Sequence, residues 1–290
     1  MKAAAVLIIG LVAISFASIF IKMCDAPSLV IAAYRLTIAS AFYFTLTRYR
    51  SGPVWAGFSW SQRKVALISG LFLTLHFTTW ITSLEFTSVA SSVVLVQSAP
   101  IFVVLGSSIF LRERPSVRTI AGVCITLAGG IIVGIHDFSI DQTSLRGNLL
   151  AICGAVGAAG YMIAGRSLRP SIDTFRYVTA VYSVAAVLLV LLTVGSGTQF
   201  FGYTIRTYLL LAAIAIVPQI IGHTIFNWGL KFFSAIAISI TLLCEPIGAS
   251  LLARSFLHET LGTTKILGGA VILTGVILVL LAEKGQNVDR

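Results

Sequence analysis

Long apolar runs separated by short polar breaks follow one another along the whole chain. Ten runs have about the length of a transmembrane α-helix, roughly 20 residues. The breaks combine glycine, proline, serine and charged residues, and none is long enough for a separate soluble domain. The pattern predicts an all-α integral membrane protein with ten transmembrane helices, at about 3–21, 28–47, 65–84, 88–111, 117–135, 148–168, 174–194, 207–229, 234–257 and 263–282.

An internal repeat divides the chain into halves. At a shift of 146 positions, residues 100–133 align with residues 246–279 without a gap, and 12 of the 34 pairs are identical. The identical pairs include a proline, a glutamate and two glycines: Pro100 and Pro246, Glu113 and Glu259, Gly122 and Gly268, Gly129 and Gly275. Apolar sequences match Leu, Ile and Val by chance, but not these residues together. The repeat predicts one unit over 1–140 and a second over 141–290, each with five helices.

An odd number of helices per unit has a topological consequence. The second unit must enter the membrane from the side opposite to the first, so the two five-helix repeats are expected to be inverted. Inverted repeats with interrupted helices are typical of secondary transporters, whose substrate sites lie near the bilayer midplane between the repeats. The repeat therefore favours transport by alternating access.

Composition and charge support a membrane environment. Hydrophobic residues make up 57% of the 290 residues and charged residues only 10%, whereas a soluble domain carries about 25% charged residues. The net charge of +10 would also suit a nucleic-acid partner, but its distribution favours the membrane. With the N-terminus inside, 14 basic residues fall on the inner side of the ten helices and five on the outer side. This bias predicts that both termini are cytoplasmic and that the chain has no nucleic-acid partner.

Four stretches carry a resemblance to a known family. They are SLVIAAYRLTIASAF, SAPIFVVLGSSIFLRERPSVRTIAGVCITLAGGIIV, IFNWGLKFFSAIAISITLLCEPIGA and the repeated CEPIGASLLARSFLHETLGTTKILGGAVILTGVILV. These stretches resemble the drug/metabolite transporter superfamily, specifically its ten-helix EamA-type branch, over essentially the whole chain. The resemblance implies a multi-pass protein of the bacterial inner membrane that exports small metabolites, often amino acids. Aromatic amino acid exporters are the nearest named group in this branch, and the family as a whole carries diverse compounds.

Glu245 and Arg35 lie deep inside two of the predicted helices, and Pro100 and Pro246 occupy equivalent positions of the repeat. A charge at the centre of a transmembrane helix costs about 2.5 kcal/mol or more unless it is paired or hydrated. Glu245 is therefore expected to face the protein interior, as a proton acceptor or a contact for a substrate amine; the alternative is a structural partner for Arg35. For Arg35, a structural or gating role is favoured over substrate binding. Because proline removes a backbone hydrogen bond and bends a helix, Pro100 and Pro246 are expected to act as hinges.

A polar column marks the predicted helix over 207–229. Gln219, His223 and Asn227 stand at i, i+4 and i+8, which places them on one face of an α-helix. Such a column suits the wall of a cavity, and the alternative is hydrogen bonding that holds two helices together. The cavity is favoured because three polar side chains exceed what one helix contact needs.

A second polar group lies in the first half of the chain. His76 and Trp80 stand one turn apart, and Gln97 comes one turn before a proline. Imidazole donates, accepts and titrates near neutrality, which suits a proton-linked or carboxylate-binding role. Trp80, Trp228 and Tyr161 could supply flat apolar walls, with ordinary packing as the alternative. The predicted substrate-binding set is His76, Trp80, Gln97, Gln219, His223, Asn227 and Trp228.

Other motifs predict structure and no bound cofactor. The small-residue ladders Gly122-Thr126-Gly130-Gly134 and Gly154-Ala158 suggest close helix packing. The four cysteines show no metal-ligand spacing, and two histidines without a third ligand are weak evidence for metal. There is no G-x-x-x-x-G-K-[ST] phosphate loop, so the driving force is expected to be a gradient.

Two other functions are open at this point. An intramembrane enzyme acting on lipid-linked or small substrates would need a catalytic pair at one membrane face, whereas the polar groups here cluster at depth. A channel would show repeated pore-lining rings. The favoured hypothesis is a non-enzymatic exporter of a small polar or amphipathic metabolite, working as a monomer or homodimer in the lipid bilayer.

Overall fold

The computed structural model of the chain is all-α. It describes residues 2–87, 89–113, 115–134, 142–257 and 263–288, and none of these residues lies in a β-strand. The helices are α1 (Lys2–Met23), α2 (Ser28–Ser51), α3 (Trp60–Phe86), α4 (Val89–Val96), α5 (Ala99–Gly106), η1 (Ser107–Leu111), α6 (Val117–Gly134), α7 (Gln142–Leu168), α8 (Thr174–Gly195), α9 (Ile205–Ile214), η3 (Ala215–His223), α10 (Thr224–Gly229), α11 (Ala235–Leu242), α12 (Glu245–Leu257) and α13 (Thr263–Val288).

Each of the ten expected apolar runs coincides with one or more of these helices. Among the described residues, seven helical stretches are long and apolar enough to cross a membrane. The other apolar helices are shorter: Ala99–Leu111, Val117–Ile132 and Ile266–Ala282. The all-α class is thus confirmed, and the count of ten transmembrane helices stays a prediction. The expected boundary between the units, at 140 and 141, and Glu259 lie outside the described residues.

Residues in the polar breaks fix where helices start. At the start of α3, Ser59 N donates to Gln62 Oε1 at 2.8 Å, and Gln62 N donates back to Ser59 Oγ at 3.3 Å. This reciprocal pair satisfies two backbone donors that the first helical turn leaves free. At the start of α8, the side chain of Asp173 accepts from Phe175 N at 2.9 Å. The same breaks that separate the apolar runs therefore also begin the helices.

Two of the expected long helices are broken in the middle, at equivalent places. At the break between α4 and α5, Ser98 N donates to Leu95 O at 3.1 Å. At the break between α11 and α12, Cys244 N donates to Thr241 O, also at 3.1 Å. These two bonds are related by the shift of 146 positions, so the repeat seen in the sequence extends to the backbone conformation.

The two prolines lie just after these breaks. Pro100 and Pro246 are each the second residue of the half-helix that follows, α5 and α12. Proline suits the first helical turn because its missing N–H would have no partner there. The expected hinges are therefore complete interruptions, and each proline starts a new half-helix.

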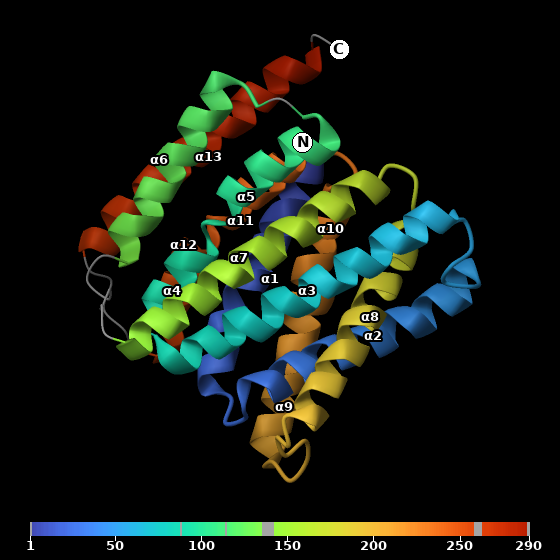
Figure 1. Cartoon of the computed structure of the whole chain (residues 1–290). Helices are drawn as coiled ribbons and strands as arrows, with labels where there is room; N and C mark the ends of the chain where they lie inside the picture. The colour runs from blue at the N-terminus through green and yellow to red at the C-terminus, as the bar shows by residue number, and fades with distance from the viewer. Residues whose placement is uncertain (1, 88, 114, 135–141, 258–262, 289–290) are drawn as a thin grey trace.

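Contacts between helices also follow the repeat. α3 and α5 of the first half pack on α7 of the second half, and the equivalent η3 and α12 of the second half pack on α1 of the first. Two contacts join equivalent helices of the two halves, α2 with α8 and α6 with α13, and the two interrupted spans also meet, through α5 and α11. In Figure 1 the α6–α13 pair lies at the upper left, and α2 and α8 lie together at the lower right. This exchange of partners is the pattern that a two-fold relation between halves would produce.

Glycines bring α6 and α13 into backbone contact. A Cβ added at Gly129 would lie 2.8 Å from Gly268 O, and one added at Gly275 would lie 2.6 Å from Gly122 O. The glycines that are identical between the repeats thus meet one another across the helix pair. At Gly130 an added Cβ would meet nothing within 4 Å. The expected ladder through Gly130 is therefore wrong. The residue that returns to the helix face of Gly122 is the seventh residue after it, Gly129.

This contact predicts opposite effects at two adjacent glycines. We expect Gly129→Ala to lower the free energy of unfolding by about 1–3 kcal/mol, because the new methyl group collides with the backbone of α13. Gly130→Ala is the matched control, and we expect it to be neutral or to stabilise the helix by up to about 1 kcal/mol. Thermal unfolding of the purified variants in detergent measures both. Equal effects of the two substitutions would show that the α6–α13 contact is not as described.

Candidate functional site

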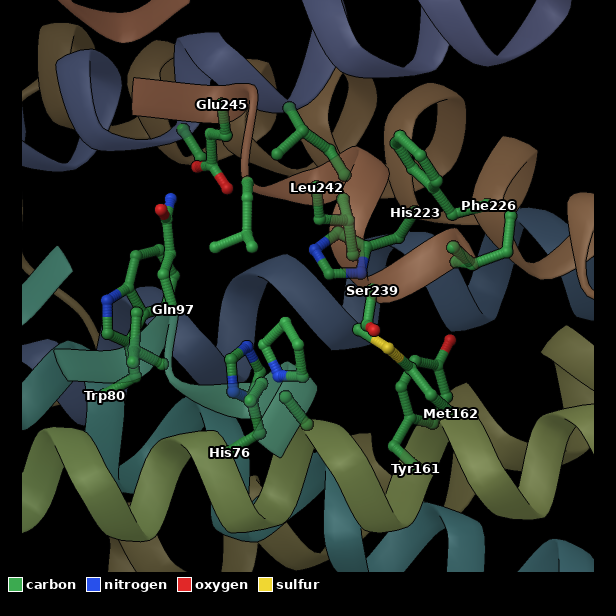
Figure 2. A pocket seen from close by; sticks show the side chains of 18 of the residues that line it. His76, Trp80, Gln97, Tyr161, Met162, His223, Phe226, Ser239, Leu242 and Glu245 are labelled. Atoms are coloured by element: carbon green, nitrogen blue, oxygen red, sulfur yellow. The ribbon is translucent and has the colours of Figure 1, made fainter. Parts of the chain in front are cut away.

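One cavity lies where the interrupted helices meet. Its volume is about 90 Å³, and both halves of the chain contribute to its wall. Figure 2 shows side chains facing one another across it, with His76, Trp80 and Gln97 opposite His223, Leu242 and Glu245. The lining residues are Ile14, Ala17, Arg35, His76, Trp80, Val96, Gln97, Ala99, Pro100, Ala158, Tyr161, Met162, His223, Phe226, Asn227, Leu230, Ile238, Ser239, Leu242, Leu243 and Glu245.

Arg35 of α2 is buried against this cavity with 0% of its surface exposed. Its Nε donates to Gln219 Oε1 at 2.6 Å, and its guanidinium carbon lies 4.3 Å from the centre of the Phe77 ring. Its Nη1 and Nη2 atoms have no hydrogen-bond partner within the described protein. The expected partner Glu245 borders the same cavity but forms no ion pair with Arg35 among the described residues. Gln219, and not Glu245, accepts the hydrogen bond from Arg35 Nε. Gln219 therefore contacts Arg35 and does not itself line the cavity.

His76 of α3 is held in place by α7. Its Nδ1 lies 2.9 Å from Gly154 O, and since a carbonyl only accepts, Nδ1 carries the proton and Nε2 is the acceptor of the neutral ring. The two helices can approach this closely because Gly157 has no Cβ atom. A Cβ at this position would lie 2.6 Å from His76 N. The imidazole stacks on Trp80, with ring centres 5.6 Å apart and planes 11° apart. Close packing at Gly154 is confirmed, since a Cβ there would lie 3.0 Å from Trp80 Cβ.

Glu245 and Gln97 come from the two equivalent helix breaks. Glu245 is the first residue of α12, where the free N–H groups and the helix dipole favour a carboxylate. Gln97 follows α4 and is 9% exposed, and neither atom of its amide has a hydrogen-bond partner among the described residues. Figure 2 shows the two side chains pointing toward one another. Each break therefore supplies one polar side chain to the same cavity.

The expected polar column is divided by a change of helix type. The column assumed α-helical periodicity, but η3 is a π-helix with Pro218 inside it, and its hydrogen bonds run from i to i+5. His223 and Asn227 line the cavity, whereas Gln219 points to Arg35. The spacing of the polar residues in the sequence does not indicate that this segment is a π-helix.

Asn227 forms the centre of a buried hydrogen-bond network. Its Nδ2 carries two hydrogens and lies within hydrogen-bond distance of three acceptors: the hydroxyl of Tyr161 on α7, Tyr182 OH at 3.2 Å and His223 O at 2.9 Å. Tyr182 OH in turn lies 3.3 Å from Thr224 Oγ1. The network joins α7, α8 and α10, so the alternative role of interhelical hydrogen bonding applies to Asn227 together with its place in the cavity wall.

Trp228 lies outside this cavity, on the other face of α10. It lines a second cavity of about 710 Å³, whose wall also includes Arg169, Lys231 and Phe175. Its ring centre lies 4.8 Å from that of Phe232. α10 therefore separates the two cavities, with Asn227 toward the first and Trp228 toward the second.

Two arginines of the α7 end hold α10 in this position. Arg169 Nε donates to Asn227 O at 2.9 Å, and Arg166 Nη1 donates to Leu230 O at 2.9 Å. Arg166 Nε also forms an ion pair with Glu113 Oε1 at 3.1 Å. Both arginines thus hold the separating helix through its last backbone carbonyls.

Phe77, Met162 and Ser239 are site residues that the sequence did not reveal. Met162 and Ser239 line the cavity, and Phe77 lies behind it between Arg35 and His223, whose ring centre is 5.5 Å from its own. All three are common in packed transmembrane helices and break no pattern. The part of the chain that the structure describes also contains no group of three His, Cys, Asp or Glu residues that could hold a metal ion.

Comparison with known proteins gives a family and a fold. The profile of the EamA-like transporter family matches residues 1–135 and 145–281. A crystal structure superposes with a TM-score of 0.82 over 98% of this chain and 98% of its own, at 20% sequence identity, which shows a shared fold alone.

Several curated proteins are similar over most of their length. An uncharacterized transporter of Archaeoglobus fulgidus is 25% identical, over 71% of this chain and 72% of its own. The uncharacterized transporter YxxF of Bacillus subtilis is 24% identical, over 78% and 73%. The pseudopaline exporter CntI of Pseudomonas aeruginosa is 24% identical, over 89% and 88%.

The Asn227 network predicts a difference between two tyrosines. Tyr161→Phe removes an acceptor from a buried amide, so we expect the free energy of unfolding to fall by about 0.5–1.5 kcal/mol. Tyr49→Phe is the matched control, because Tyr49 is 90% exposed and we expect no measurable change. Thermal unfolding in detergent checks both, and an unchanged Tyr161→Phe variant would contradict the network.

Proposed function

This chain belongs to the EamA-like transporter family, and we propose that it is a secondary transporter that exports a small metabolite across the bacterial inner membrane by alternating access. Family membership and the seven long apolar helices among the described residues make it a multi-pass membrane transporter of a small molecule. The direction of transport, the membrane and the mechanism are our proposals. They rest on the cavity, the helix breaks and the internal repeat.

The observation that carries the proposal is the gathering of unpaired polar groups at one cavity. Ten buried side-chain nitrogen or oxygen atoms lack a hydrogen-bond partner in the described part of the chain, and six of them belong to Arg35, Trp80, Gln97 and Gln219. Folded proteins pair nearly all such atoms. Three of these residues line the cavity and the fourth, Gln219, contacts Arg35. A site of this kind suits a polar or amphipathic compound that supplies the missing partners.

The internal repeat supports alternating access. We propose two inverted five-helix units that meet near residues 140 and 141, with ten transmembrane helices and both termini in the cytoplasm. The matching hydrogen bonds at the two helix breaks and the exchange of helix partners support a two-fold relation. Inversion then allows the same packing to open toward either side of the membrane.

The size of the cavity supports movement of the helices during transport. A volume of about 90 Å³ is well below the roughly 300–1,000 Å³ of pockets that hold small molecules. Cargo therefore needs the walls to separate. We propose that the half-helices after Pro100 and Pro246, together with α10, move to open the site.

The side chains around the cavity suggest the kind of cargo. Stacked His76 and Trp80 offer a flat surface, and Glu245 offers a contact for an amine or a place for a proton. The relative that carries a named cargo is a pseudopaline exporter. We propose an amino acid or a similar amphipathic metabolite, with His76, Trp80, Gln97, His223 and Asn227 in contact with it.

Flux through proteoliposomes tests the function. We expect a labelled compound from a panel of amino acids and related metabolites to cross the membrane unchanged and only when the protein is present. Chemical conversion of the compound without net movement would indicate an enzyme and would overturn the transport proposal.

Glu245→Gln tests the proton role. If Glu245 carries the coupling proton, transport by the variant should no longer respond to a pH gradient, whereas exchange of labelled for unlabelled cargo at equal pH should continue. Flux in the two modes, measured in the same preparation, separates a lost proton site from a misfolded protein. A variant that keeps its full pH response would exclude Glu245 from this role.

The two tryptophans provide a matched pair. We expect Trp80→Leu to raise the KM for transport by about tenfold, since an aromatic contact with the cargo is worth about 1 kcal/mol or more. Trp228→Leu should leave KM unchanged, because Trp228 faces the second cavity. Equal KM values for the two variants would show that the cargo does not contact Trp80.

A further inference from the structure

The guanidinium of Arg35 is satisfied on one side and unpaired on the other. Gln219 accepts from Nε at 2.6 Å and the Phe77 ring covers one face at 4.3 Å, while Nη1 and Nη2 have no partner among the described residues. Arginine keeps its charge in proteins. Burying such a charge without a counter-charge costs several kcal/mol, so this arrangement is costly unless an anion completes it.

Among the described residues, no carboxylate lies in hydrogen-bond contact with Nη1 or Nη2. Among the residues that line the cavity, Glu245 is the only carboxylate, and it forms no ion pair with Arg35. The two contacts that Arg35 does make are to a neutral amide and to an aromatic ring. Both hold the guanidinium plane in one orientation without cancelling its charge.

We propose that Arg35 binds a carboxylate of the exported compound through Nη1 and Nη2. Two parallel N–H groups match the two oxygens of a carboxylate, which gives both strength and a fixed orientation. Gln219 and Phe77 are positioning residues, because they act on the guanidinium and not on the cargo. The proposal rests on the proposed function and adds to it the chemical group by which cargo is recognised.

Burial of Arg35 agrees with this role once the cavity opens. The side chain borders the cavity but has 0% of its surface exposed, so a carboxylate reaches it only when the walls separate. Arg35 then becomes accessible in the open form and is covered again around the bound anion. In the closed form, the charge of Arg35 is unpaired only when cargo is absent. Closure is therefore more favourable with cargo bound than without it.

Gln219→Glu gives the sharpest test of the guanidinium. The new carboxylate would stand at the position of Gln219 Oε1 and form an ion pair with Arg35 inside the protein. We expect thermal stability in detergent to be equal to or higher than that of the parent, and KM for transport to rise by about tenfold or more, because a hydrogen-bonded charge pair with the cargo is lost.

Gln219→Leu is the matched control for this substitution. It removes the hydrogen bond to Nε and adds no charge, so stability should fall while KM rises less than in Gln219→Glu. If Arg35 were purely structural, Gln219→Glu would transport at least as well as Gln219→Leu. That order of KM values would overturn the proposal.

The cargo chemistry is tested on the unmodified protein. Proteoliposomes are incubated with the pooled soluble metabolites of a bacterial lysate, and compounds taken up only when the protein is present are identified by mass. Each is then compared with its methyl ester. We expect every transported compound to carry a carboxylate, and its ester to compete at least about tenfold less well.

The outcomes separate this inference from the transport proposal. A transported compound without a carboxylate, or an ester that competes equally, would overturn the role of Arg35 and leave transport intact. Uptake of no component at all would overturn the transport proposal and this inference with it. Arg35→Lys keeps the charge but not the paired N–H groups, and we expect it to retain the preference for acid over ester with weaker binding.

Discussion

A break in a transmembrane helix leaves backbone N–H and C=O groups without partners, and hydrocarbon offers them none. Such breaks are stable only where they face protein or a polar cavity. Here the interruptions before α5 and α12 and the π-helix η3 all border the same site, through Pro100, Glu245 and His223. The position of the cavity therefore follows from the position of the breaks. The polar side chains beside the breaks lie where the free backbone groups already require a polar environment.

The two halves share a scaffold but not their chemistry. Glycines that are identical between the repeats pack against one another, and both breaks repeat the same hydrogen bond. At the equivalent positions of the site, however, Glu245 matches Ala99 and Gln97 matches Leu243. Symmetry thus maintains the packing, while each half contributes different functional groups. A symmetric scaffold with an asymmetric lining suits a protein that opens in two directions and recognises one orientation of its cargo.

Sequence reasoning succeeded where one residue type has one physical consequence. The prolines marked the two breaks, and the isolated charges Glu245 and Arg35 both border the cavity, whereas the glycine ladder through Gly130 followed the wrong face of α6. Sequence reasoning failed where the outcome depends on winding or on a neighbour far along the chain. The π-helix turned Gln219 toward Arg35, which no spacing rule for an α-helix anticipates. Phe77 looked like packing because its contact with a guanidinium is made only in three dimensions.

Hydrogen bonds from the end of α7 hold the cavity wall that α10 forms. Movement of α10 away from α7 would break the hydrogen bonds from Arg169 to Asn227 O and from Arg166 to Leu230 O. Each bond from a charged donor is worth about 1.5–3 kcal/mol. At the position equivalent to Asn227, Ile81 O accepts from the neutral hydroxyl of Ser28 at 3.1 Å, a bond worth about 0.5–1.5 kcal/mol. Ser28 N also donates to Glu85 Oε1 at 3.2 Å, so both ends of the repeat are held by hydrogen bonds to charged groups, although the groups differ. In the mechanism that we propose, cargo bound at the cavity makes new contacts with the walls, and this binding energy offsets the contacts that opening breaks.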